Sequence, residues 1–183
     1  MATSDNGTTH AFGPNVFVSK HPVLSHKITI LRSSSTAPST FRSVLQEVTY
    51  HLGYEATSCM TTRPIEVSVS AGKEEASQHQ DCTGQKLVEN TALIPILRSG
   101  LGMSDSMLQL LPKSQVHHIG MYRIPGHAPV QYYNRLPKKC AADIAFVLDP
   151  ALGSASTMMA VVAQLKKVRQ KMMTIHTRTV SDP

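Results

Sequence analysis

The stretch TALIPILRSGLGMSDSMLQLLPKSQVHHIGMY, residues 91–122, decides the fold class. Residues 91–97 are continuously apolar, which is typical of a strand buried on both faces of a parallel sheet, although Pro95 cannot donate a hydrogen bond to a neighbouring strand. A helix ending at Pro112 is predicted next, because four apolar residues recur at helical spacing: Met103, Met107, Leu108 and Leu111. Residues 116–122 predict another strand, so the unit is strand, helix, strand.

The same succession recurs after a polar, proline-marked stretch at residues 123–140. Residues 144–148, IAFVL, form a second short apolar run, and the helix after it has an apolar face made by Met158, Val161, Val162, Leu165 and Val168. We interpret its methionines as packing residues rather than as a cofactor-binding box. Alternating buried strands and amphipathic helices predict an α/β fold, a mostly parallel sheet flanked by helices. Such sheets bind ligands in loops beyond the carboxyl ends of their strands.

The N-terminal half gives weaker signals. Residues 1–15 are polar and contain glycine and proline, which predicts a disordered arm. A helix is predicted to begin at Ser39, as its N-cap, and to end at Gly53. Residues 65–69 alternate between apolar and polar side chains as in a half-exposed strand, and the polar residues 71–84 predict a hairpin tip or loop.

Composition bounds the class of protein. A chain of 183 residues with 41% hydrophobic content is long enough for one domain with a core. Its three cysteines are too far apart for a CxxC pair or an even disulfide framework, which favours a reduced, cytoplasmic protein. No apolar run approaches the roughly 18 residues that span a bilayer, so we expect no membrane association.

The formal net charge of +6 is concentrated near the C-terminus. Residues 166–183 hold one acidic residue, Asp182, and these basic ones: Lys166, Lys167, Arg169, Lys171 and Arg178. Because the same segment has no aromatic residue, a solvated basic tail is favoured over nucleic-acid binding.

The loop LDPALGSAST, residues 148–157, links the second apolar run to its helix. The free N–H groups and the dipole of a helix start attract phosphate, and three hydroxyl donors stand close by: Ser154, Ser156 and Thr157. Gly153 permits an unusual backbone angle, and the Asp149 carboxylate suits ribose hydroxyls or a hydrated metal ion. An ordinary strand-to-helix turn with a serine N-cap explains this loop alone equally well.

Two arginines occupy equivalent positions after predicted strands. Arg98 directly follows residues 91–97, and Arg123 directly follows residues 116–122. Each by itself is explained by a structural ion pair or a solvated loop. Together with the Asp149 loop they predict a site for a ligand with both a phosphate and a pyrophosphate, since guanidinium groups bind phosphate oxygens in bidentate fashion.

Four segments in order resemble the uracil phosphoribosyltransferase family: PILRSGLGMSDSMLQLLP, VHHIGMYR, VQYYNRLP and VLDPALGSAST. The segments KHPVLSHKITILRSSST and LGYEAT also resemble the opening region of that family. The resemblance covers about residues 16–168. It implies a type I phosphoribosyltransferase fold and the reaction of uracil with phosphoribosyl pyrophosphate, which yields UMP and pyrophosphate with Mg²⁺ bound to the donor.

The resemblance also implies roles for residues at matching positions. Arg98 and Arg123 would contact the pyrophosphate, and Asp149, the catalytic residue, would hold ribose hydroxyls. The 5′-phosphate would be wrapped by the segment made of Pro150, Ala151, Leu152, Gly153, Ser154, Ala155, Ser156 and Thr157. Catalysis would rest on positioning and on electrostatic stabilisation of an oxocarbenium-like ribosyl centre, with no metal site formed by the protein alone.

The phosphate loop departs from the family pattern. That loop usually resembles DPMLATGGS, whereas Ala151 replaces the methionine here, and Ser154, Ala155 and Ser156 stand where Thr-Gly-Gly is common. Added β-carbons restrict positive φ angles, while the hydroxyls keep the number of donors up. We therefore expect weakened but retained phosphate binding.

The C-terminal end departs further. The family sequence continues past residue 168 to a PGLGDAGD-like segment that recognises uracil, whereas residues 169–183 here are interpreted as an atypical basic tail from a truncated or frame-shifted end. We therefore expect a partial phosphoribosyltransferase domain at residues 16–168, a fold incomplete at its C-terminus, and no uracil-binding segment. We therefore expect no UMP formation by this chain. The alternative is an inactive module that binds a phosphorylated ligand or pairs with a full-length subunit.

Further expectations concern partners and metals. The resemblance implies a homodimer and, as in some members, a GTP effector site, for which Lys27 and Arg32 are candidates; a solvated loop is the simpler interpretation of both. Adjacent residues on a strand face opposite ways, so His117 and His118 are not expected to ligate one metal ion together.

Overall fold

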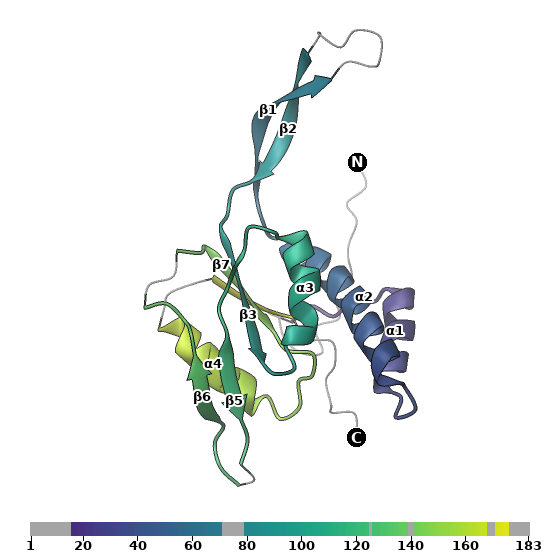
Figure 1. Cartoon of the computed structure of the whole chain (residues 1–183), viewed down its shortest axis with the longest axis vertical. Coiled ribbons are helices and arrows are strands. Elements are labelled where there is room, and N and C mark those ends of the chain that lie inside the picture. Colours follow the sequence, from purple (N-terminus) through teal and green to yellow (C-terminus); the bar gives the residue numbers. More distant parts are fainter. Residues whose placement is uncertain (1–15, 71–78, 125, 139–140, 168–170, 176–183) are drawn as a thin grey trace.

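A computed structural model describes residues 16–70, 79–124, 126–138, 141–167 and 171–175. The predicted N-terminal arm, residues 1–15, and much of the predicted basic tail lie outside this part of the chain. No helix within the described part is long and apolar enough to cross a membrane. Figure 1 shows an α/β body from which one hairpin projects.

The sheet of the body is built around β3 (Thr91–Leu97). Its neighbours β5 (Ile119–Tyr122) and β7 (Ile144–Leu148) run parallel to it, one on each side. With β6 (Val130–Asn134) and β8 (Lys171–Ile175) at the edges, the strand order is β6-β5-β3-β7-β8. All of β7 and all of β3 except Leu97 are buried, which confirms the two strands predicted from continuous apolar runs. The chain leaves β3 toward one neighbour and later returns on the other side, which makes its carboxyl end a switch point where ligands bind in open α/β sheets.

Two strands differ from their prediction. The strand predicted over 116–122 is interrupted at His117 and His118, so that β4 (Gln115–Val116) and β5 pair in turn with β3. The stretch predicted as a polar connection contains β6 (Val130–Asn134), which is antiparallel to β5. Four of the five residues of β6 are exposed, so no apolar alternation marked it in the sequence.

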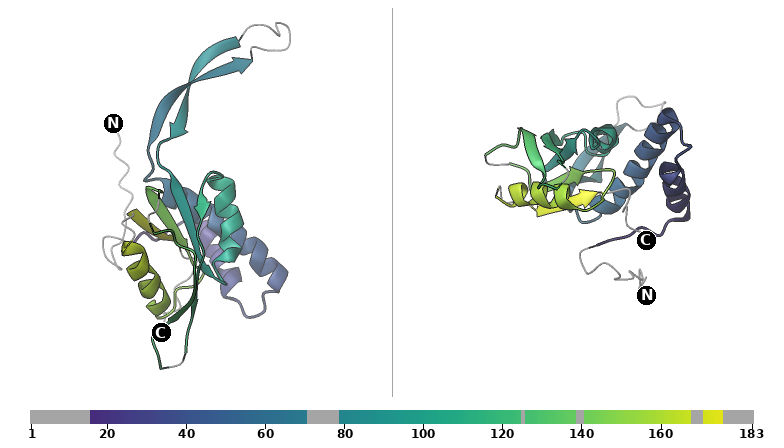
Figure 2. Two further views of the ribbon diagram at one scale, coloured as in Figure 1. Left: turned by 60° about the vertical axis from the view of Figure 1, so that its left-hand side comes forward. Right: turned by 90° about the horizontal axis from the view of Figure 1, so that it is seen from below.

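Helices cover both faces of this sheet. On one face, α1 (Pro22–Arg32), α2 (Pro38–Thr57) and α3 (Leu101–Leu110) pack in one apolar core with Leu93 of β3 and Phe146 of β7. On the other face, α4 (Ser156–Lys166) packs against Ile94 and Val147. Figure 2 shows α4 on the opposite side of the sheet from α2 and α3. Neighbouring residues of one strand thus serve opposite cores, as the continuous apolar runs require.

The N-terminal helices correct three predictions. The N-cap of α2 is Ala37 rather than Ser39, and the helix continues past Gly53 to Thr57. A β-carbon on Gly53 would lie 2.5 Å from Leu110 Cδ1 and 2.9 Å from Met107 Sδ, so this glycine permits close packing of α2 on α3 instead of ending the helix. The predicted loop around Lys27 and Arg32 is helix α1, and Lys27 forms an ion pair with Glu47 of α2.

The projecting hairpin consists of β1 (Thr62–Ser70) and β2 (His79–Leu87), paired antiparallel over nine residue pairs. Residues 79–84 belong to β2, so the predicted loop over 71–84 was wrong in that part. Within the described chain, the two strands pack on each other and on no other helix or strand. The hairpin therefore has two exposed faces (Figure 1).

The sheet continues beyond residue 168, where the phosphoribosyltransferase domain was predicted to end. Strand β8 (Lys171–Ile175) pairs parallel with β7, and Ile175 is buried in the core shared with the first three helices. The Ile175 carbonyl oxygen also accepts a hydrogen bond from the Asp149 amide at 3.3 Å. Five residues of the interval predicted as a tail thus support the end of β7.

Candidate functional site

Three predicted site residues follow three neighbouring parallel strands. Arg123 follows β5, Arg98 follows β3, and Asp149 follows β7. Parallel strands present their carboxyl ends at one edge of the sheet, so the strand order brings these residues to the same edge. The edge lies at the switch point described above.

The turn after β3, Arg98 to Gly100, is held tightly against the end of β7. The Gly100 amide donates a hydrogen bond to the Ile96 carbonyl oxygen at 2.8 Å, and the Leu97–Arg98 peptide bond is cis. A β-carbon on Gly100 would lie 2.6 Å from the Ile96 nitrogen and in collision with the Leu148 carbonyl oxygen. Only glycine fits this approach, which fixes the distance between the Arg98 turn and the Asp149 loop.

Asp149 is a buried carboxylate that joins these two loops. Its exposed fraction is 8%, and its Oδ1 accepts a hydrogen bond from Ser99 Oγ at 3.1 Å. Burying a carboxylate is unfavourable unless hydrogen bonds compensate, so Ser99 fixes the orientation of this group. Sequence analysis did not assign a role to Ser99, although its place beside Arg98 was a usable signal.

The loop after Asp149 delivers the chain to the start of α4. Ala155, the N-cap of α4, has a φ of 57°, in the left-handed region, and no side chain caps the helix start by a hydrogen bond. The unusual angle expected at Gly153 thus occurs at Ala155, and the alternative of a serine N-cap is wrong. The amides of this helix start remain suited to an anion. Ser154 Oγ and Ser156 Oγ are 3.0 Å apart beside it.

Arg123 lies against this loop. Its Nε donates a hydrogen bond to Thr157 Oγ1 at 2.8 Å, and its Nη1 is 3.9 Å from where a β-carbon on Gly153 would stand. The guanidinium therefore reaches the phosphate loop from the neighbouring strand. A contact of Arg123 with pyrophosphate remains a prediction.

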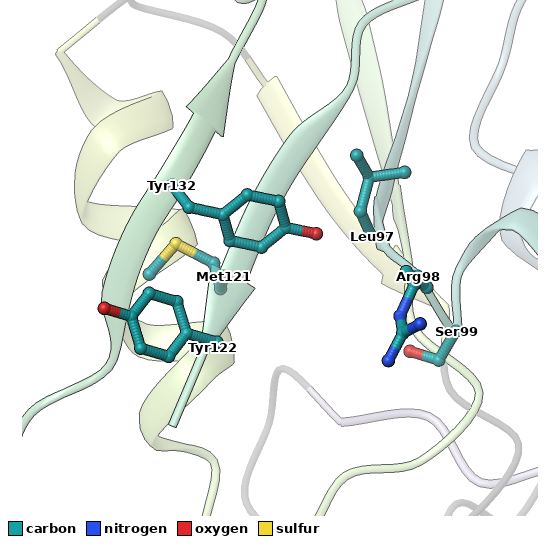
Figure 3. Close-up of a pocket in the computed structure, with 6 residues that line it drawn as sticks. All are labelled: Leu97, Arg98, Ser99, Met121, Tyr122 and Tyr132. Atoms are coloured by element: carbon teal, nitrogen blue, oxygen red, sulfur yellow. The ribbon is translucent and has the colours of Figure 1, made fainter. Parts of the chain in front are cut away.

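An open cleft of about 620 Å³ lies between the Arg98 turn and strands β5 and β6. Figure 3 shows the six residues that line it: Leu97, Arg98, Ser99, Met121, Tyr122 and Tyr132. Sequence analysis missed the two tyrosines as site residues, although both stand in segments that resemble the family. Their rings are tilted by 50° with centroids 6.1 Å apart.

The described residues form no metal-binding cluster of their own. Within them, no group of three or more His, Cys, Asp or Glu side chains could hold a metal ion. The two adjacent histidines lie between β4 and β5, and burial, followed by the charge of His118, lowers the pKa of His117.

Comparisons with known proteins show the family to which this chain is similar. A model of the family described as uracil phosphoribosyltransferase matches residues 18–180. A uracil phosphoribosyltransferase of Roseiflexus castenholzii is 39% identical over 155 residues, which are 83% of this chain and 70% of that protein. The enzyme of the same description from Agathobacter rectalis is 40% identical over 153 residues, again 83% and 70%.

Solved structures of other proteins show which fold the chain shares. The AQ2163 protein of Aquifex aeolicus superimposes with a TM-score of 0.75 at 29% identity, over 88% of this chain and 74% of that one. A hypoxanthine-guanine phosphoribosyltransferase of Bacillus anthracis shares the fold alone, with a TM-score of 0.52 at 9% identity, over 78% and 73%. The predicted type I phosphoribosyltransferase-like fold, with a mostly parallel sheet between helices, is thereby confirmed. The chain belongs to the uracil phosphoribosyltransferase family.

Proposed function

We propose that this chain binds phosphoribosyl pyrophosphate at the edge formed by β5, β3 and β7, and that this is the donor half of a uracil phosphoribosyltransferase site. The observation that supports it best is the hydrogen bond from Ser99 to Asp149, which joins the Arg98 turn to the phosphate loop. Asp149 would accept hydrogen bonds from the ribose hydroxyls. The start of α4 would bind the 5′-phosphate through backbone amides and the hydroxyls around Ala155.

The chemistry follows from this placement. As the glycosidic bond to pyrophosphate breaks, positive charge develops at the ribose and negative charge on the leaving group. Arg98, with Arg123 in reach of the same edge, would stabilise the leaving pyrophosphate, while the buried Asp149 orients the ribose. Mg²⁺, when it arrives with the donor, supplies further charge for the pyrophosphate oxygens. The described residues fit an ion that the donor carries, since they offer Asp149 at this edge but no metal-binding cluster.

Titration calorimetry with phosphoribosyl pyrophosphate tests the donor half. We expect binding that requires Mg²⁺ and that weakens when Arg98 is replaced by alanine. A folded chain that releases no heat with donor and Mg²⁺ would contradict the proposal.

Uracil turnover separates an enzyme from a binding module. We propose that the described residues bind the donor without forming UMP by themselves, since the site residues placed at this edge all serve the donor. A chain that binds the donor and makes no UMP would fit the inactive module that was the alternative. UMP formation at an ordinary enzymatic rate, which is about 10 s⁻¹, would instead show an acceptor site within these residues.

Ala155 offers a test of the phosphate loop by stability. Replacing it by glycine is expected to raise the free energy of unfolding by about 0.5 kcal/mol, because relief of left-handed strain exceeds the entropy that glycine adds to the unfolded state. Ala160→Gly inside α4 is the matched control and should lower the same quantity by about 1 kcal/mol. Urea denaturation measures both. The prediction fails if the two glycines destabilise equally.

We also propose that the chain forms a homodimer through the hairpin of β1 and β2. The residue pairs Ile65–Gly84 and Val67–Cys82 give one face an apolar surface, and Val67 and Val69 are 37% and 46% exposed. A two-stranded hairpin alone is marginally stable in water, so a second copy packed on this face would explain its persistence.

Val67→Asp is expected to weaken the dimer roughly 100-fold, because it would bury an unpaired charge in the interface. Ser68→Lys puts a charge on the opposite face of the same strand, next to its pairing partner Asp81, and as the control it should leave the dimer intact. Light scattering over a dilution series gives the molecular mass of each variant. Equal dissociation of both variants would exclude this face as the interface.

A further inference from the structure

The segment VQYYNRLP resembles the family, yet the donor site described above uses none of its residues. Its strand β6 pairs with β5 through an irregular register: Gly120 pairs with Tyr133, but Met121 pairs with Gln131. Tyr132 is thus the extra residue of a β-bulge. Bulges are common next to active sites, where they redirect a side chain.

The bulge directs the Tyr132 ring across the backbone of β5. A β-carbon on Gly120 would lie 2.6 Å from Tyr132 Cζ and 2.9 Å from its Cε2, so the ring rests where only a glycine leaves room. The position of this exposed aromatic side chain is therefore constrained by two features of the fold, the bulge and Gly120.

The two tyrosines of the cleft point differently. Figure 3 shows the Tyr132 hydroxyl directed toward Leu97 and the Arg98 turn, whereas the Tyr122 hydroxyl points away from them. Both rings line the cleft that begins at Arg98 and Ser99. A ligand group held by Arg98 in this cleft would meet the Tyr132 hydroxyl from the opposite wall.

We propose that Tyr132 binds the pyrophosphate group of the donor by donating its hydroxyl proton to a phosphate oxygen opposite Arg98. The inference rests on the proposed donor site and adds a residue from β6 to it. A phenol O–H hydrogen bond to a charged phosphate oxygen is stronger than one between neutral groups. Because the ring is already held on Gly120, little side-chain entropy is lost when the ligand binds.

Tyr132→Phe removes the hydroxyl and keeps the ring, and Tyr133→Phe is its matched control, an exposed neighbour on β6 that does not line the cleft. We expect Tyr132→Phe to weaken the binding of pyrophosphate with Mg²⁺ about tenfold by calorimetry. Its affinity for ribose 5-phosphate, which lacks the pyrophosphate, should stay within twofold of wild type. Tyr133→Phe should leave both affinities unchanged.

Gly120→Ala provides a second variant. Its β-carbon would lie 2.6 Å from Tyr132 Cζ and 2.9 Å from Tyr133 Cβ, so it should displace the Tyr132 ring and weaken pyrophosphate binding in the same way. Pyrophosphate affinity within twofold of wild type in Tyr132→Phe, while wild type binds both ligands, would overturn the role of Tyr132 alone. A wild-type chain that binds neither pyrophosphate nor ribose 5-phosphate would overturn the donor site and this inference together.

Discussion

Gly100→Ala is expected to lower the free energy of unfolding by about 3 kcal/mol, because the added β-carbon collides with backbone atoms that cannot move separately. Those atoms are the Ile96 nitrogen at 2.6 Å and the carbonyl oxygens of Ile96 and Leu148. They belong to the central strand β3 and its neighbour β7. Relief of the collision would have to separate the Arg98 turn from the end of β7, so donor affinity should fall as well.

Gly102→Ala is the matched control for this prediction. Its β-carbon would meet only Leu45 Cδ2, at 2.9 Å, which is the far end of a flexible side chain. Alanine is also a better helix former than glycine inside α3, so we expect a change within about 1 kcal/mol in either direction. Urea denaturation at a constant slope compares the two variants. Equal stability of Gly100→Ala and wild type would show that the turn is not held as described.

The strands at the centre of the sheet could be predicted from sequence because both of their faces are buried. Residues 92–97 and 144–148 are apolar throughout, since one side chain faces α3 and the next faces α4. Arg98 and Asp149 follow these runs directly, so the same argument located two residues of the candidate site. Because burial of both faces requires apolar residues at every position, such strands can be predicted from the local sequence alone.

Elements with little burial escaped prediction for the opposite reason. β2 packs on β1 alone and β6 is largely exposed, so neither needs an apolar pattern. Gly53 has the residue type of a helix end, but the contact that determines its role comes from α3, more than fifty positions away along the chain. Backbone geometry was equally hidden, since the left-handed residue of the phosphate loop is Ala155 rather than Gly153.

Asp149→Ala is expected to weaken the binding of phosphoribosyl pyrophosphate roughly 100-fold. A hydrogen bond to a charged acceptor contributes about 1.5–3 kcal/mol, and the proposed site uses this carboxylate for the ribose hydroxyls. Inorganic phosphate should bind as in wild type or more tightly, because the variant keeps the start of α4 and loses a negative charge nearby. Asp105→Ala, which removes an exposed carboxylate from α3, is the matched control and should change neither affinity.

A variant of Ser99 tests whether its hydrogen bond holds the Asp149 carboxylate in the orientation that accepts from the ribose. Ser99→Ala removes the hydroxyl that donates to Asp149 Oδ1 at 3.1 Å but leaves the carboxylate. We therefore expect a smaller loss of affinity for phosphoribosyl pyrophosphate, about tenfold. If Ser99 acts through Asp149, the double variant should bind the donor no more weakly than Asp149→Ala alone, because the two losses share one mechanism. Strictly additive losses would mean that Ser99 contacts the phosphoribosyl donor itself.

Donor affinity within threefold of wild type in Asp149→Ala would contradict the proposed role of the carboxylate, since no other feature of that variant compensates for a lost ribose contact.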